Sequence, residues 1–430
     1  MNKFIIKTLG CKTNQIESAI IEEKLIEAGF VLEKSIEESN FYILNSCSVT
    51  DNADCKALSL LRSVKKQNPS IKTILTGCFA QLEHKSLAKK IEIDFLVGNN
   101  EKLDIPKIIE LKSKICVSDI FDSKKFNYQK LKSIHKTRAI VKIQDGCNNR
   151  CSYCTIPLAR GINRSNSIKN IIEQITVLEE NGFDEVVFTG IHIGQWGQDL
   201  APCLSLIDLL KEVEKTKITR YRLGSLNPLE LNDNLLNFLS VSDKFCPHFH
   251  MSLQSGCDKI LAAMNRMYSY EFSLEIIEKI NKLFEDPFIG SDIIVGFPGE
   301  NNNDFEETYS NLSKTNLSQI HVFPYSKRKN TKAYDMTNQV PENLKKERVS
   351  KIKEISDIKH QLFLQKNIGK TLEIIVEDRK DKNSGLYKGV SRNYINILVA
   401  GMPVSDNKLQ KVNILSLSKD AKKLIGKFIN

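Results

Sequence analysis

The sequence has no long apolar run. Its first residues, MNKFIIKTLGCKTNQ, lack the apolar stretch of a secretory signal peptide. Nowhere does the chain approach the roughly 20 uninterrupted apolar residues that a membrane-spanning helix needs. Internal repeats and low-complexity tracts are also absent. We therefore expect a cytoplasmic globular protein without membrane contact. In that reducing compartment its 11 cysteines should serve metal binding or catalysis rather than a disulfide framework.

Length and charge indicate how many domains the chain has and what kind of partner it binds. The chain has 430 residues, of which 41% are hydrophobic and 27% charged, so we expect two or three globular domains. The net charge is +10, and residues 341–430 hold 19 Lys and Arg against 10 Asp and Glu. A basic C-terminal region suits a nucleic-acid partner, because phosphate neutralisation supplies most sequence-independent affinity. A solvated lysine-rich surface explains the same charge equally well.

Three cysteines lie within one short loop. Cys147, Cys151 and Cys154 are spaced C-x3-C-x2-C in the run GCNNRCSYC. Cubane iron–sulfur clusters usually take four cysteines, and no fourth ligand lies nearby. This spacing suggests a cubane whose last iron is open and able to bind and reduce a small molecule.

The first ~115 residues alternate between strand and helix patterns. Asn14 and Glu17 would cap the first helix, and Gly29 would end it. This rhythm favours an open parallel sheet with helices on its faces. The expected strands cover residues 3–9, 41–44, 72–76 and 94–97, and the helices cover 14–28, 50–66 and a stretch from about 79.

Three more cysteines follow the strands of this first part. Cys11, Cys47 and Cys78 each lie just past the C-terminal end of an expected strand. In a parallel sheet these ends share one edge, where such folds place their sites. The three thiols should therefore converge. Buried cysteines acting as small apolar residues, or a zinc site with a fourth ligand, remain alternatives.

The rest of the chain predicts two further units. Six strand–helix pairs fall short of the eight of a closed barrel, so we expect an open partial (β/α)6 barrel followed by a charged helix over 342–365. The last ~60 residues alternate apolar and polar positions and predict a small antiparallel β-barrel, a common format for RNA binding. The expected domains span residues 1–115, 133–365 and 367–430, and the barrel strands cover 137–144, 185–188, 220–223, 248–253, 289–295 and 319–323.

The motifs along the chain carry a family resemblance. The loop GCNNRCSYCTIPLARG resembles the cluster loop of radical S-adenosylmethionine (SAM) enzymes, and the whole chain is similar to the methylthiotransferases within that superfamily. The match runs in order through LGCKTNQIES, NSCSVTDNAD, LTGCFAQ, TGIHIGQWG, SLQSGCDKILAAMNR, DIIVGFPGE and PYSKRKNTKA. It implies an N-terminal methylthiotransferase domain, a radical SAM core and a C-terminal TRAM-like RNA-binding domain.

The resemblance also implies cofactors and a reaction. The loop cysteines would hold a [4Fe–4S] cluster that binds SAM and cleaves it to a deoxyadenosyl radical. Cys11, Cys47 and Cys78 would hold a second [4Fe–4S] cluster that supplies sulfur, and a second SAM would supply the methyl group. The substrate would be carbon 2 of threonylcarbamoyladenosine beside the anticodon in tRNA. Expected partners are the tRNA anticodon stem-loop, an electron donor such as a flavodoxin, and a sulfur source.

Alternative substrates and functions stay open. Other branches of the family modify isopentenyladenosine in tRNA or an aspartate of a ribosomal protein. CNNRCSYCTIPLARG and NSCSVTDNAD look most like the threonylcarbamoyladenosine branch. Outside this family, a zinc-containing RNA-binding protein would explain the cysteines and the basic tail.

Four residues are candidates for SAM contacts, and each has a structural explanation beside the functional one. Tyr153 would pack on the adenine or in the core. Gly190 would let the backbone approach the methionine end or simply form a turn. Gln254 would reach the ribose or be solvated, and Gly296 would border the adenine or form a tight turn.

Other polar residues have weaker assignments. Arg160 and Arg164 would contact SAM or phosphate, or simply be solvated. Trp196 would line the barrel mouth or pack. The lone histidines, His192 among them, are expected to be structural. The remaining cysteines are expected to be buried free thiols: Cys55, Cys116, Cys203, Cys246 and Cys257.

Overall fold

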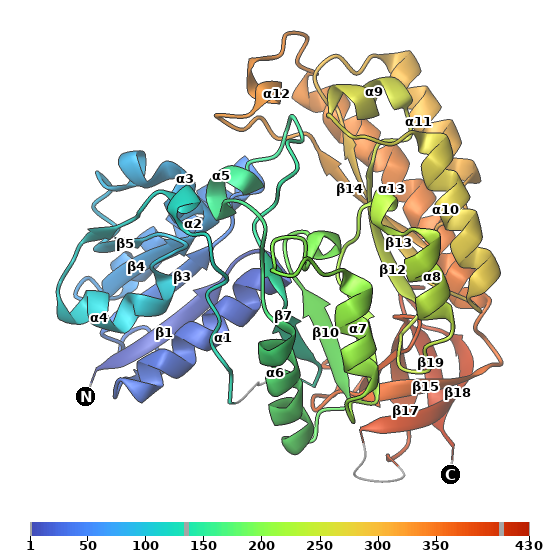
Figure 1. The fold of residues 1–430 in the computed structure, drawn as a ribbon, viewed down its shortest axis with the longest axis horizontal. Helices are drawn as coiled ribbons and strands as arrows, with labels where there is room; N and C mark the ends of the chain where they lie inside the picture. The colour runs from blue at the N-terminus through green and yellow to red at the C-terminus, as the bar shows by residue number, and fades with distance from the viewer. Residues whose placement is uncertain (1, 133–136, 404–407, 430) are drawn as a thin grey trace.

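The chain folds into three parts that pack against one another. The computed structural model describes residues 2–132, 137–403 and 408–429. Figure 1 shows an N-terminal α/β unit in blue, a larger curved sheet wrapped by helices in green to orange, and a small red barrel beneath the curved sheet. None of the helices in these ranges is both long and apolar enough to cross a membrane.

The N-terminal unit is a six-stranded parallel sheet in the order β2-β1-β3-β4-β5-β6. The central strands are buried on both faces, since α1 and α4 cover one face and α2 and α3 the other. This confirms the open parallel sheet. Its elements are β1 (Lys3–Thr8), α1 (Lys12–Glu27), β2 (Val31–Leu32), β3 (Phe41–Ser46), α2 (Asp51–Gln67), β4 (Lys72–Gly77), α3 (Cys78–Leu87), β5 (Phe95–Val97), α4 (Ile105–Glu110) and β6 (Ile115–Cys116).

The central unit is an open barrel of six parallel strands. Two three-stranded groups, β11-β10-β7 and β12-β13-β14, meet through single bridges from Tyr221 to Phe245 and from Leu226 to Met251. The partial barrel is thereby confirmed. Its strands are β7 (Ala139–Lys142), β10 (Glu185–Thr189), β11 (Arg220–Leu223), β12 (His248–Gln254), β13 (Phe288–Val295) and β14 (Gln319–Pro324).

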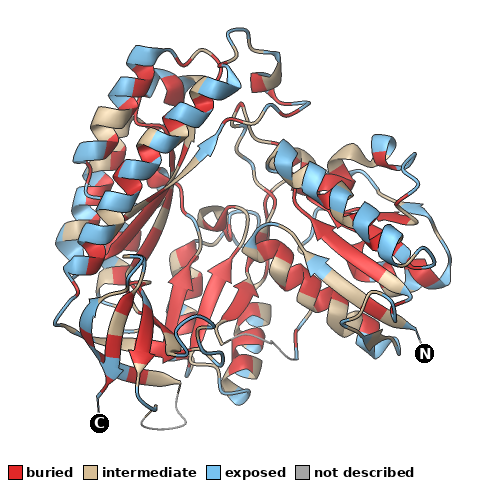
Figure 2. Ribbon diagram, turned by 180° about the vertical axis from the view of Figure 1, so that it is seen from behind, coloured by how far each residue is buried: buried red, intermediate tan, exposed pale blue. Residues whose placement is uncertain are grey.

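Helices cover the outside of this barrel. Figure 2 shows their outward faces exposed, while the strands beneath are mostly buried. The last and longest, α13, packs on β14 at the open side. The helices are α6 (Ile168–Glu180), α7 (Leu206–Glu214), α8 (Asp233–Ser240), α9 (Asp258–Ala263), α10 (Tyr270–Leu283), α11 (Asn302–Lys314) and α13 (Glu342–Gln365); α5 (Ile156–Arg160) and α12 (Lys332–Asp335) are short helices in loops.

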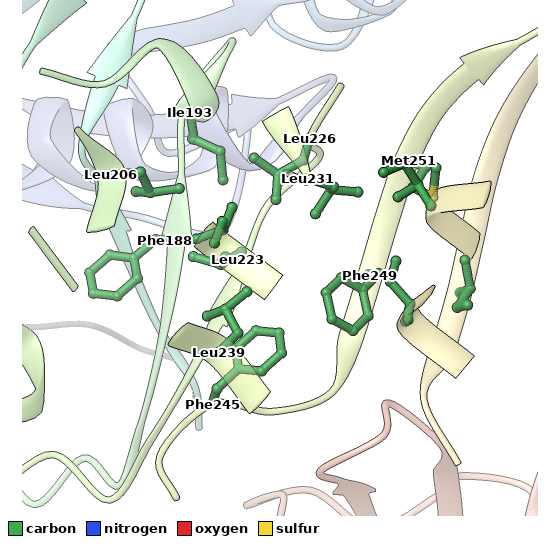
Figure 3. Packing of buried hydrophobic residues seen from close by; sticks show 14 of the residues in the cluster. Phe188, Ile193, Leu206, Leu223, Leu226, Leu231, Leu239, Phe245, Phe249 and Met251 are labelled. Atoms are coloured by element: carbon green, nitrogen blue, oxygen red, sulfur yellow. The ribbon is translucent and has the colours of Figure 1, made fainter. Parts of the chain in front are cut away.

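One apolar core lies between strands and helices of the central unit. Figure 3 shows part of it, with Phe188 and Leu223 from neighbouring strands beside Leu206 and Leu239 from the covering helices. Trp196, the only tryptophan in the chain, is fully buried in this core. Its indole Nε1 donates a hydrogen bond of 2.9 Å to the carbonyl of Asn166, so packing rather than lining the mouth explains it.

The C-terminal part is a closed five-stranded barrel in the order β15-β16-β17-β19-β18. The expected barrel is confirmed, but one pair, β17 with β19, is parallel rather than antiparallel. A closed ring with an odd number of strands cannot alternate direction at every pair, so one parallel pair is unavoidable. The strands are β15 (Thr371–Val376), β16 (Tyr387–Ser391), β17 (Asn396–Ala400), β18 (Leu409–Leu417) and β19 (Leu424–Phe428).

This small barrel is fixed to the N-terminal ends of the central strands. Arg222 donates hydrogen bonds to the carbonyls of Ser391 (2.6 Å) and Arg392 (2.7 Å). The Tyr394 ring stacks on His248 with a centroid separation of 4.0 Å. The turn between β16 and β17 therefore closes the lower end of the open barrel.

Replacing Phe188 with alanine should destabilise the central unit by about 3–5 kcal/mol, because it leaves a cavity in a closely packed core. Trp196 fluorescence during denaturation reports on this same core and measures the loss. Ile91→Ala is the matched control, since Ile91 is 93% exposed and should leave the transition unchanged. A similar shift for both variants would contradict the packing described here.

Candidate functional site: two cysteine trios at one interface

A short, tightly held loop carries the first trio of cysteines. Gly146 has φ +72, and a side chain there would lie 1.8 Å from the carbonyl oxygen of Ile162, so only glycine fits. The backbone N–H of Cys147 donates to the carbonyl of Gly161 (3.1 Å), and that of Cys154 to Cys151 (3.1 Å). These bonds hold the three cysteines in one turn at the barrel mouth.

Two cationic side chains contact the sulfurs of this loop. The Arg266 guanidinium donates to the Cys151 sulfur at 3.2 Å, and the His192 Nδ1 lies 3.4 Å from the Cys147 sulfur. The other ring nitrogen of His192 pairs with Glu230. Burial opposes the charged imidazole, but the Cys147 thiol and the Glu230 carboxylate raise the pKa of His192 to about 10. At neutral pH the imidazole is therefore protonated and can donate to the Cys147 sulfur.

His192 was expected to be structural, so its contact with Cys147 was missed. The available signal was its position in TGIHIG, directly after the end of β10 (Glu185–Thr189), where side chains reach the mouth of such a barrel. Arg266 was also missed: it ends the motif SLQSGCDKILAAMNR, but it follows the short helix α9 (Asp258–Ala263) and no local pattern points it at the loop.

The second trio lies at one edge of the N-terminal sheet, as predicted. Cys11 precedes α1 and follows β1, Cys47 follows β3, and Cys78 opens α3 directly after β4. Strands β1, β3 and β4 are neighbours, so their C-terminal ends adjoin. A side chain on Gly10 would meet the Cys47 Cβ at 2.6 Å, so the loops carrying Cys11 and Cys47 touch.

Burial favours the neutral thiol at one cysteine of each trio. Burial, with the neighbouring Cys78 thiol, raises the pKa of Cys47 to about 11. Burial and the neighbouring Cys151 thiol raise the pKa of Cys154 to about 12. Metal binding displaces such protons. In residues 2–132, 137–403 and 408–429, no three Cys, His, Asp or Glu side chains converge on a point that would hold a single ion. A cubane spreads its cysteines over separate irons, and the all-thiol donor set of each trio fits that group.

The two trios belong to segments that contact each other. Helix α3, which begins at Cys78, packs against α5, which begins two residues after Cys154. The Asn99 side chain adds a hydrogen bond of 2.6 Å to the carbonyl of Ala159 in α5. The N-terminal sheet edge and the cysteine loop thus form one interface.

A buried charge network fastens this interface. Glu17 of α1 accepts from Arg160 (2.8 Å), Lys102 (2.7 Å) and Lys142 (2.7 Å). Burial opposes ionisation of Glu17, but these three cations outweigh it and hold the pKa of the carboxyl well below its usual range. Arg160 also reaches Asp145, two residues before Cys147, at 3.0 Å. The network therefore links α1 to the start of the cysteine loop.

This network corrects two expectations. Asn14 and Glu17 do not cap the first helix, which starts at Lys12 without a side-chain cap. Both side chains turn instead to partners distant in sequence, and Asn14 accepts from Arg160 at 2.6 Å. Arg160 and Arg164 are not solvated: both are buried, and Arg164 donates to the carbonyls of Ser123 (3.0 Å) and Arg160 (2.7 Å).

A second clamp lies on the far side of the trio. Arg328, in the loop after β14, donates to Ser48 (2.6 Å) and Asp54 (2.6 Å) and also pairs with Asp51. These partners lie just after Cys47, at the start of α2. The open barrel therefore contacts the N-terminal unit at both of its edges. Arg160 makes the contact in the loop after the first barrel strand, β7, and Arg328 makes it in the loop after the last strand, β14.

The four candidate SAM contacts lie on barrel loops. Tyr153 packs beside the apolar cluster of Cys257 and Phe297. A side chain on Gly190 would meet the Gln144 amide oxygen at 2.8 Å, and one on Gly296 would meet Lys345 at 2.4 Å, so close packing accounts for both glycines. Their contacts with SAM stay a prediction.

Gln254 differs from the other three. It is buried at the end of β12 and has φ +74, a strained conformation for a residue other than glycine. Strain of this kind collects at functional sites, and this favours a role for Gln254 in binding.

The remaining cysteines divide by burial. Cys246 and Cys257 are buried as expected, and Cys116 is half-buried, whereas Cys55 and Cys203 are exposed. The exposed pair lies on an outward part of α2 and in the loop before α7, positions that no core covers.

Comparisons with known proteins agree with this geometry. Residues 141–312 match the Radical SAM superfamily, and residues 3–98 match the Uncharacterized protein family UPF0004. The threonylcarbamoyladenosine tRNA methylthiotransferase of Aquifex aeolicus is 34% identical over 99% of both chains, and that of Thermotoga maritima is 35% identical over 96% of this chain and 95% of its own. A tRNA-2-methylthio-N(6)-dimethylallyladenosine synthase of Acetivibrio thermocellus is 31% identical over 90% of this chain and 83% of its own.

Solved structures share the fold. The radical SAM methyltransferase TsrM from Kitasatospora setae superposes with a TM-score of 0.58 at 10% identity, covering 78% of this chain and 77% of its own. The open barrel and the three-cysteine loop thus define a radical SAM enzyme, which uses SAM and a [4Fe–4S] cluster. More narrowly, the chain belongs to the family of radical SAM tRNA methylthiotransferases.

Replacing Glu17 with glutamine should lower the free energy of unfolding by about 3–5 kcal/mol, because three buried cations lose their anion. Since the folded pKa of Glu17 lies below its ordinary value of 4.5, its contribution is full above that value and is lost as pH falls through the folded pKa. The difference between wild type and Glu17→Gln should therefore be constant near neutral pH and shrink below about pH 4.5.

Denaturation followed by circular dichroism measures this difference. Glu110→Gln, an exposed position on α4, is the matched control and should change stability little. A constant difference from pH 7 down to pH 3 would contradict the ionised state of Glu17.

Proposed function

We propose that the protein methylthiolates carbon 2 of threonylcarbamoyladenosine next to the anticodon in tRNA. The loop cysteines hold the SAM-binding [4Fe–4S] cluster, and Cys11, Cys47 and Cys78 hold a second one that supplies sulfur. SAM held at the loop cysteines would supply the radical chemistry that acts on the ring carbon, and a second SAM would supply the methyl group. Cleavage of SAM would need one electron to start, and the product gains one sulfur atom, so an electron donor such as a flavodoxin and a sulfur source would be partners.

The observation that carries this proposal is the contact between the segments bearing the two trios. A carbon without an acidic proton needs a radical on one side and a sulfur donor within bonding reach on the other. Helices α3 and α5 bring the second and the first trio to one interface, and the Glu17 network supports them. A single site between the trios meets that demand.

Side chains of the chain prepare the loop for its cofactor. Arg266 and protonated His192 donate to two of the loop sulfurs and offset negative charge there. Hydrogen bonds to cluster sulfurs are a known lever on reduction potential. Gln254, strained and buried at the strand end, is the residue we assign to the SAM ribose, with Tyr153, Gly190 and Gly296 around it.

We infer that the substrate is tRNA because the relatives are named as enzymes that modify tRNA and because the C-terminal barrel is basic. That barrel, residues 367–430, would bind the anticodon stem-loop in the manner of a TRAM domain. Nucleosides of tRNA from a deletion strain test the assignment by mass spectrometry. We expect the methylthio form of threonylcarbamoyladenosine to disappear. Loss of methylthio-isopentenyladenosine instead would overturn the substrate.

The two trios should have separable roles. Cys151→Ala should abolish SAM cleavage to 5′-deoxyadenosine, whereas Cys47→Ala should keep that cleavage and lose the methylthio product. Each variant should hold about four irons, against about eight in wild type. Cys203→Ala, an exposed cysteine, is the control and should keep both activities.

Anaerobic iron and sulfide analysis with chromatography of the products measures these outcomes. Wild-type protein reconstituted with only about four irons would contradict the second cluster. Zinc in place of iron would favour a non-redox RNA-binding protein.

A further inference from the structure

A cavity of about 430 Å³ lies where the three parts of the chain meet. Helix α1 contributes Lys12, the lower ends of the barrel strands contribute Arg138 and Arg222, and the C-terminal barrel contributes Arg379 and Tyr394. Lys12 directly follows Cys11 of the second trio. The cavity therefore extends from the sheet edge bearing that trio to the turn that closes the barrel below.

Positive charge exceeds negative charge around this cavity. One fully buried carboxylate, Glu185, faces Arg220 (2.7 Å) and Arg222 (2.9 Å), with Arg138 at 3.9 Å. Glu373 lies 3.3 Å from Arg220 and is the second acid of this group. Of the residues that line the cavity, Lys12, Arg138, Arg222, Arg379 and Lys388 are basic and Glu377 and Asp378 are acidic. The two acids pair with Lys388 (2.8 Å) and Lys408 (3.3 Å).

Lys12 is the cation left without an anion. Its side chain is half-buried, and in the described part of the chain it makes no hydrogen bond and no ion pair. Its charge is repelled by Arg138 and Arg222, and it is attracted by Tyr394 and, more weakly, by Glu185. Burying an ammonium group beside other cations is costly unless an anion joins it.

Aromatic rings form the floor of the cavity. Tyr394 lies under the guanidinium groups of Arg222 (5.3 Å) and Arg138 (5.8 Å) and stacks on His248. The Nδ1 atom of His248 is buried and has no hydrogen-bond partner among the described residues. Cations above a flat aromatic floor are suited to a planar anionic group.

We propose that this cavity binds the carboxylate of the amino-acid substituent on the substrate adenosine, with Lys12 and Arg138 as its partners. The inference rests on the proposed function and deepens it. Threonylcarbamoyladenosine carries such a carboxylate, whereas a dimethylallyl substituent is apolar and would leave Lys12 unpaired. Lys12 and Arg138 therefore determine specificity between the two kinds of modified adenosine.

Equilibrium binding of synthetic anticodon stem-loops to the cluster-loaded protein tests this inference without any turnover. Three RNAs differ only at the adenosine: one carries threonylcarbamoyl, one its neutral methyl ester, and one no substituent. We expect the acid to bind about tenfold more tightly than the ester, because the ester cannot pair with buried cations. In Lys12→Gln and Arg138→Gln the ratio of the affinity for the acid to that for the ester should fall towards one. The affinity for the unsubstituted RNA should not change.

Lys388→Gln is the matched control, since Lys388 lines the same cavity but pairs with Glu377 at 2.8 Å. It should keep the preference for the acid. Iron content and circular dichroism equal to wild type show that each variant is folded and loaded.

The possible failures are distinct. If Lys12→Gln weakened the binding of all three RNAs equally, the cavity would bind a backbone phosphate. That result would overturn the proposal that it binds the carboxylate of the substituent. Equal binding of acid and ester by wild type would overturn it as well. If wild type bound none of the RNAs, the proposed function itself would fail.

Discussion

The ion cluster around Glu17 is the constraint on which the arrangement of this protein depends. One buried carboxylate of the N-terminal unit takes hydrogen bonds from Lys102 of its own unit and from Arg160 and Lys142 of the barrel. Buried charges gain little stability over apolar packing, but breaking them is costly, so they are satisfied in only one relative placement. The cluster therefore sets the position of the N-terminal sheet against the cysteine loop more than it adds net stability.

That fixed placement matters for radical chemistry. In the proposed reaction the substrate carbon and the sulfur donor would both have to be held in place, because a radical reacts with whichever atom lies beside it. The Glu17 cluster lies near the first barrel strand, β7, and the Arg328 clamp follows the last strand, β14. Together they support the interface at both edges of the open barrel. Both contacts involve residues close in sequence to a cysteine trio. A change in the position of the N-terminal unit relative to the barrel would therefore move the two trios relative to each other.

The sequence predicted what depends on local pattern and missed what depends on distant partners. Helix α13 (Glu342–Gln365) and the edge shared by Cys11, Cys47 and Cys78 follow from local sequence pattern and strand ends, and the structure places them as expected. The i, i+3 spacing of Asn14 and Glu17 is the same in a capping box and in a helix face turned to another domain. Arg160, 143 residues from Glu17, decides between them, and no local window contains it.

The C-terminal barrel is part of the central cavity rather than an independent RNA-binding tail. Its excess of lysine and arginine predicts affinity for RNA, yet the turn at residues 391–394 is buried under the central strands. There its carbonyls accept hydrogen bonds from Arg222, and Tyr394 stacks on His248. Through Arg379 and Tyr394 this barrel therefore forms one wall of the cavity. In the proposed complex with tRNA, the bound RNA would lie against that wall, and a shift of the barrel would move Tyr394 from beneath Arg222 and Arg138.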